Sequence, residues 1–225
     1  MLFFDSSYFL YMIPGLVAVM WAQYKVKSAY AKYSKVANSS GVSGAQLARA
    51  LLDRNSLADV GVEPVAGELT DHYDPRGKIL RLSEGIYGGR SVAAAGIVAH
   101  EVGHAVQDSK NYVPMKIRAG LVPIAGFGSS LGPILIIAGF FLRFAGLINL
   151  GIIAFAAAVL FQIVTLPVEF NASSRAMKML SDGGYIYQEE YGPTRQVLSA
   201  AAYTYLAATL TSILMLLYYV GLSRR

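Results

Sequence analysis

The chain has 225 residues and a net charge of +5, with 55% hydrophobic and only 15% charged residues. Typical soluble domains carry about 25% charged residues, so this composition excludes an ordinary soluble domain and favours a membrane protein. The absence of cysteine excludes disulfides and thiolate metal ligands, and we interpret the basic excess as a signal for membrane orientation, with no nucleic-acid partner.

Four apolar runs with almost no charge predict four transmembrane helices, because about 20 helical residues cross the hydrocarbon core of a bilayer. The predicted spans cover residues 7–23, 119–142, 144–168 and 201–222. The second and third meet at Arg143, so their connection must be very short. No basic segment precedes the first span and no clear cleavage site follows it, so we expect a retained anchor and not a signal peptide.

The segment between the first two spans is long and polar enough to form a small domain. Ser43 is predicted to cap a helix that begins there, and residues 60–65 and 78–82 alternate like short strands around a turn-rich loop. Ser83 is predicted to cap a short helix, and Ser91 the helix VAAAGIVAHEVGHAVQ.

These elements predict five regions along the chain. They are a first transmembrane helix (1–24), a metal-binding domain (25–118), two further transmembrane helices (119–168), a second polar segment (169–200), and a fourth transmembrane helix with a short tail (201–225).

Basic residues near the ends of the spans predict the orientation in the membrane. Ten of thirteen flank the two long polar segments: Lys25, Lys27, Lys32, Lys35, Lys110, Lys116, Arg118, Arg175, Lys178 and Arg195, against Arg143, Arg224 and Arg225. Since cytoplasmic loops carry the excess of Lys and Arg, residues 25–118 and 169–200 are expected in the cytoplasm and both termini outside. The predicted location is the plasma membrane.

The sharpest chemical signal is an H-E-x-x-H motif at His100, Glu101 and His104. In a helix, four residues turn the chain by about 400°, so both imidazoles lie on one face about 6 Å apart along the axis. Both can then reach one zinc ion, with Glu101 placed to take a proton from a metal-bound water. The alternative is a pair of ordinary helix-face histidines beside a surface glutamate.

A hydrolytic zinc site needs a third protein ligand. The candidates are one histidine, His72, and four carboxylates: Glu169, Asp182, Glu189 and Glu190. We favour Glu169, because a carboxylate at the predicted end of the third span is costly unless it is paired or metal-bound. The alternative is an interfacial glutamate at a helix start, where the helix dipole stabilises its charge.

Three segments, GELTDHYDPRGKILRLSEGIYGG, AGIVAHEVGHAVQDSKNY and LPVEFNASSRAMKML, together resemble the bacterial YugP-type membrane zinc metallopeptidases. The chain is more distantly similar to the HtpX-like and CAAX prenyl protease gluzincins, which share H-E-x-x-H and a downstream E-x-x-A, here residues 169–172. The resemblance implies Zn²⁺ held by His100, His104 and Glu169, with Glu101 as the general base.

The resemblance leaves open what orients the two histidines. Gluzincins often place aspartate four residues after the third ligand, where this chain has Ser173. Asn171, Ser173 and Asp108 are the candidates for that role.

By analogy with gluzincins, the segment before the metal helix forms an edge strand that pairs with an extended peptide or protein substrate. His72, Tyr73 and Arg175 are candidates to stabilise the developing oxyanion. The alternatives are a turn network of His72 with Asp71 or Asp74, and an ion pair or ligand-supporting role for Arg175.

Together these features predict a mainly α integral membrane protein with four transmembrane helices and a cytoplasmic gluzincin-like metalloprotease domain that carries a small β element. The predicted function is zinc-dependent endopeptidase activity on membrane or membrane-proximal proteins. The main alternative is a catalytically inactive zinc-binding scaffold, which the presence of Glu101 disfavours, since a structural site needs no base. A transporter is disfavoured because the spans hold almost no ionisable groups. Natural substrate and oligomeric state stay open.

Overall fold

The computed structural model describes residues 6–224. The chain divides into two compact units. We call the first the apolar unit (Met1–Gln23, Val113–Pro167 and Tyr203–Arg225) and the second the sheet unit (Tyr24–Tyr112 and Val168–Ala202). Three helices contribute residues to both units: α1 (Ser6–Tyr33), α6 (Ala145–Asp182) and α7 (Gln188–Ser223). α5 (Val113–Phe141) belongs to the apolar unit alone.

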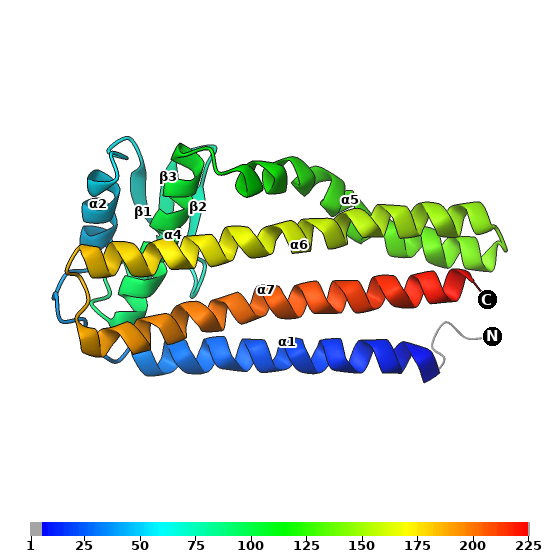
Figure 1. Cartoon of the computed structure of the whole chain (residues 1–225), viewed down its shortest axis with the longest axis horizontal. Helices are drawn as coiled ribbons and strands as arrows, with labels where there is room; N and C mark the ends of the chain where they lie inside the picture. Colours follow the sequence, from blue (N-terminus) through cyan, green and yellow to red (C-terminus); the bar gives the residue numbers. More distant parts are fainter. Residues whose placement is uncertain (1–5, 225) are drawn as a thin grey trace. The chain divides into compact units, whose positions relative to one another are not determined.

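Four of the helices within residues 6–224 are long and apolar enough to cross a membrane: α1, α5, α6 and α7. This confirms the prediction of four candidate spans. The helices extend beyond the predicted spans, because the flanking polar residues continue the helix instead of ending it (Figure 1). The α5–α6 connection is short, as expected, and Arg143 takes a left-handed conformation there, with φ of 53°.

Glycines let α5 and α6 pack closely within the apolar unit. A Cβ at position 151 would lie only 2.7 Å from the carbonyl oxygen of Gly132. Such close backbone approach is typical of helix pairs that associate in a membrane.

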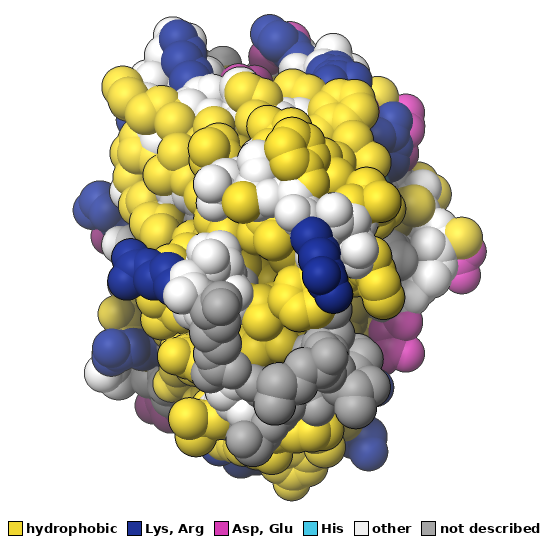
Figure 2. All heavy atoms as spheres, turned by 90° about the vertical axis from the view of Figure 1, so that its right-hand side faces the viewer, with side chains coloured by type: hydrophobic (Ala, Val, Ile, Leu, Met, Phe, Trp, Pro, Cys, Tyr) yellow, Lys and Arg dark blue, Asp and Glu magenta, His cyan; other side chains and the backbone are white. Residues whose placement is uncertain are grey.

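The outer surface of the apolar unit is itself hydrophobic. Leu10, Phe141 and Ile153 are 72%, 77% and 68% exposed. Figure 2 shows a face of the molecule on which hydrophobic side chains predominate. A large exposed apolar surface of this kind is suited to contact with lipid.

The sheet unit contains a three-stranded sheet of order β1-β3-β2. β3 (Ile79–Ser83) pairs in parallel with β1 (Gly61–Val65) and antiparallel with β2 (His72–Asp74). Leu80 and Leu82 are fully buried, which confirms the alternation predicted for β3. β2 lies in the segment predicted as a loop; that prediction was wrong because these three residues pair with β3 and form an edge strand.

Helices α2 (Gly44–Arg54) and α4 (Val92–Ser109) begin as predicted from their caps. The Ser43 hydroxyl accepts a hydrogen bond from the Gln46 amide, and the Gln46 side chain accepts one from the Ser43 amide, forming a capping box. The Ser91 hydroxyl accepts from Ala94. Ser83 precedes α3 (Glu84–Tyr87) but makes no side-chain cap, because its hydroxyl donates to the Asp71 carboxylate instead.

The buried core of the sheet unit brings α4 close to the part of α6 that belongs to this unit. Leu80, Leu82 and Val98 pack in one cluster with Leu180. A Cβ at position 103 would lie 2.7 Å from the Ala172 carbonyl oxygen and 3.2 Å from its Cα. Glycine at 103 thus allows near-contact of the two backbones within the H-E-x-x-H motif.

Candidate metal centre

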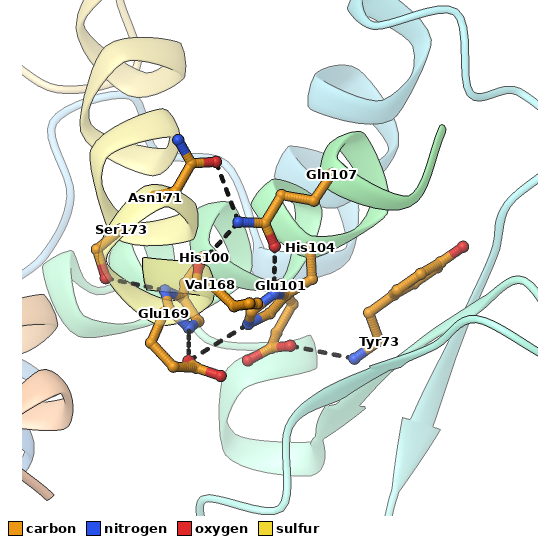
Figure 3. A network of polar contacts seen from close by, with 9 residues as sticks. All are labelled: Tyr73, His100, Glu101, His104, Gln107, Val168, Glu169, Asn171 and Ser173. Atoms are coloured by element: carbon orange, nitrogen blue, oxygen red, sulfur yellow. Dashed lines mark hydrogen bonds and ion pairs between the residues drawn. The ribbon is translucent and has the colours of Figure 1, made fainter. Parts of the chain in front are cut away.

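Four side chains of the sheet unit converge at this crossing (Figure 3). α4 contributes His100, Glu101 and His104, and α6 contributes Glu169. The Glu169 Oε2 atom lies 3.2 Å from His100 Nε2 and 3.5 Å from His104 Nε2. The two imidazole rings have centroids 4.8 Å apart and stand nearly perpendicular, at 86°. The helical spacing of the histidines therefore places both Nε2 atoms toward one carboxylate.

The donor atoms fit a zinc ion. In a tetrahedral site with bonds of about 2.1 Å, neighbouring donor atoms lie about 3.4 Å apart. The two measured separations, 3.2 Å and 3.5 Å, bracket that value. One ligand atom from each of His100, His104 and Glu169 lies within 4.8 Å of the others. The set of two nitrogens and one oxygen is one that zinc prefers in hydrolytic sites.

The charge of the site also calls for a cation. Glu169 is only 2% exposed, and His104 is buried beside it. Glu101 lies on the same face and is partly buried. A buried carboxylate charge in so poorly solvated a place is costly unless it is compensated. A divalent ion would neutralise it.

Glu101 is held by the edge strand and not by the two histidines. The Tyr73 backbone N–H donates to Glu101 Oε2 at 3.1 Å. Burial raises the pKa of the Glu101 carboxyl, and the nearby histidines offset only part of this rise. Glu101 thus stands beside the ligand set in a fixed direction, which suits a proton acceptor.

The second nitrogen of each histidine has its own partner. His104 Nδ1 lies 2.9 Å from Gln107 Oε1, and His100 Nδ1 lies 3.1 Å from Ser173 Oγ. Of the three candidates proposed from the sequence, Ser173 contacts a histidine directly and Asn171 bonds to Gln107. Asp108 instead accepts from the Tyr73 phenol at 2.9 Å. Sequence reasoning missed Gln107, although its position three residues after His104 on an apolar helix could have indicated it.

The remaining carboxylate candidates lie elsewhere. Asp182 pairs with Lys178 at 2.7 Å, and Glu190 accepts the backbone N–H groups of Ser39 and Tyr187. Glu189 is exposed. Glu169 does not start a helix, since α6 continues without a break from Ala145 to Asp182. The alternative of a helix-start glutamate stabilised by the dipole was therefore wrong.

The side chains of His72 and Tyr73, two of the predicted oxyanion groups, make contacts with residues outside the ligand set. His72 is exposed, and its Nδ1 lies 2.8 Å from the Thr70 carbonyl oxygen. The Tyr73 ring points away from the histidines (Figure 3), and burial together with the bond to Asp108 raises the pKa of its phenol.

Arg175 contacts a neighbour on its own helix. Its Nε donates to Asn171 Oδ1 at 2.7 Å. The side chain lines a cavity of about 250 Å³ together with Arg54, Lys110 and Lys178, and none of the candidate zinc ligands lines it. The predicted ligand-supporting alternative for Arg175 therefore fits its position better than oxyanion contact.

Paired histidines and a carboxylate on crossing helices, together with four membrane-length helices, are the features of membrane zinc peptidases. The chain belongs to the family described as "Putative neutral zinc metallopeptidase", whose model matches residues 8–224. It is 51% identical over 208 residues, 92% of each chain, to "Putative membrane protease YugP" of Bacillus subtilis (strain 168). No solved structure matches it.

Proposed function

We propose that this protein is a membrane-embedded zinc endopeptidase of the gluzincin type that cleaves membrane or membrane-proximal proteins. The observation that carries the proposal is the convergence of His100, His104 and Glu169, with Glu101 beside them. The family and the relative support the coarser statement of a zinc peptidase in a membrane.

Each residue has a defined task in this proposal. His100, His104 and Glu169 hold zinc, which when bound lowers the pKa of a coordinated water toward about 7. The Glu101 carboxylate takes a proton from the attacking water and delivers it to the nitrogen of the leaving amine. Its bond from the Tyr73 N–H keeps the carboxylate in position for this transfer.

The substrate is proposed to bind as an extended strand along β2. β2 is at the edge of the sheet, and the Tyr73 N–H points to Glu101 and so away from β3. Since a strand residue directs its N–H and C=O to the same side, the Tyr73 carbonyl also lies at this edge and would accept from the peptide, while the N–H stays bonded to Glu101. A peptide pairing there would lie beside the general base, with affinity from its backbone and little sequence preference.

Metal removal tests the proposed function. The purified full-length protein should contain stoichiometric zinc and cleave an unfolded test protein. A chelator should abolish cleavage, and added Zn²⁺ should restore it, because three ligand atoms are already gathered. Metal content and fragment formation are measured on the same samples. Bound zinc without cleavage under any condition would support the alternative of a non-catalytic scaffold.

The proposed active site faces the cytoplasm, on the count of basic residues that flank the polar segments. The chain has no cysteine, so single cysteines report without interference. Cysteines introduced at the exposed positions Ser39 and Ser223 should react with a membrane-impermeant thiol reagent from opposite sides. In intact cells, only the Ser223 variant should be labelled. Labelling of the Ser39 variant from outside would reverse the topology.

A further inference from the structure

Zinc binding through His104 Nε2 requires one tautomer of the ring. A nitrogen that binds metal must be unprotonated, so the ring proton must be on Nδ1. His104 Nε2 faces Glu169, and Nδ1 lies 2.9 Å from Gln107 Oε1. The required tautomer therefore donates Nδ1–H to the Gln107 side-chain oxygen.

The Gln107 amide is oriented to accept that proton. Its Nε2 donates to the Val168 carbonyl at 2.8 Å and to Asn171 Oδ1 at 3.0 Å. Gln107 is fully buried, so water cannot replace a lost partner. Reversing the amide would set its oxygen against two acceptors and its NH₂ against the His104 Nδ1–H.

The orientation of Asn171 depends in turn on Arg175. A guanidinium has donors and no acceptor. Arg175 Nε donates to Asn171 Oδ1 at 2.7 Å, so this oxygen is held where it also accepts from Gln107. Without the guanidinium, only the Gln107 NH₂ would oppose an Asn171 flip, so the orientation of Asn171 would be less strongly fixed.

We propose that Arg175, Asn171 and Gln107 form an oriented hydrogen-bond relay that fixes His104 as a Nδ1–H donor with its Nε2 lone pair toward the metal. These are positioning residues, and the relay rests on the proposed function's assignment of His104 as a zinc ligand. His100 has a different support, since the Ser173 hydroxyl at 3.1 Å both donates and accepts and so selects no tautomer. In other zinc sites an aspartate accepts the second ring N–H of a ligating histidine and so fixes its tautomer and orientation; here the relay does this for His104.

Zinc affinity of the full-length protein, measured by competition with a chromophoric chelator, tests the relay. Gln107→Leu should weaken binding about 10–100-fold, the usual cost of losing an outer partner of a metal ligand. Arg175→Met should weaken it by a smaller factor, about 3–10-fold, because the Val168 carbonyl still holds Gln107. Lys178→Met is the matched control: it removes a cation lining the same cavity, on the same helix, that pairs with Asp182. It should leave zinc affinity unchanged.

Variants at position 171 distinguish an oriented hydrogen-bond relay from a role of Asn171 in packing alone. Both contacts of Asn171 Oδ1 are as an acceptor, so Asn171→Asp should retain zinc affinity, whereas Asn171→Leu should weaken binding as Arg175→Met does. The visible spectrum of the Co²⁺-loaded protein should change in the Leu variant and not in the Asp variant. Equal losses in both position-171 variants, or equal affinities of the Arg175→Met and Lys178→Met variants, would refute the relay. If His104→Ala itself left zinc affinity intact, the proposed ligand set would fail instead.

Discussion

Replacing Glu101 by glutamine should leave zinc affinity nearly unchanged and reduce peptide cleavage by about 10²–10⁴-fold, the usual cost of losing a general base. Glu101 lies beside the ligand set, whereas the Nε2 atoms of both histidines lie close to the Glu169 carboxylate. Zinc affinity should therefore not depend on Glu101. A glutamine oxygen still accepts the Tyr73 N–H that Glu101 accepts, so the local structure should persist. What glutamine lacks is a basic oxygen able to hold a proton during the reaction.

The measurement is initial cleavage rate and metal content for the two proteins in parallel. Glu84→Gln is a suitable control, because Glu84 is exposed in the first turn of α3. It makes the same chemical change outside the site and should cost no activity. Full activity in the Glu101→Gln protein would end the metallopeptidase interpretation.

Replacing Glu169 by alanine should lower zinc affinity as strongly as His104→Ala does, and by more than the about 10–100-fold typical of losing an outer-shell partner. The Glu169 carboxylate is the group that both Nε2 atoms face, at 3.2 Å and 3.5 Å. Alanine leaves two nitrogens and no third protein ligand from this set. Cleavage should fall with zinc occupancy.

Glu189→Ala is the control for Glu169→Ala, because Glu189 is an exposed carboxylate of the same sheet unit. Circular dichroism should show that both variants retain their helices, since alanine is a good helix former. A Glu169→Ala protein that binds zinc as tightly as the unaltered chain would require another third ligand. In that outcome His72 and Asp108 are the next positions to replace.

The sequence predicted those features that depend on local patterns. The helix starts at Ser43 and Ser91 could be predicted because each serine hydroxyl accepts a hydrogen bond from the backbone N–H three residues further along the chain. The buried face of β3 follows from the alternation of Leu80 and Leu82 with Ile79 and Arg81, which are less buried. The four candidate spans follow from apolar length alone.

Features that depend on contacts distant in sequence were missed or misjudged. β2 has only three residues and becomes a strand through pairing with β3, which no pattern within His72–Asp74 indicates. Gln107 gains its role from groups 61 and 64 residues away on α6.

The near-contact of α4 and α6 restricts which residues can occupy the unspecified positions of the zinc-binding motif. The motif H-E-x-x-H leaves two positions unspecified, here Val102 and Gly103. A Cβ at 103 would meet the Ala172 backbone at 2.7 Å, while Ala172 itself is fully buried. Where two helices cross this closely, the position before the second histidine must be glycine, which gives the motif H-E-x-G-H. The residue that faces this glycine on the other helix is the alanine that ends E-x-x-A. A search with both small residues fixed would therefore select chains by helix spacing as well as by metal ligands.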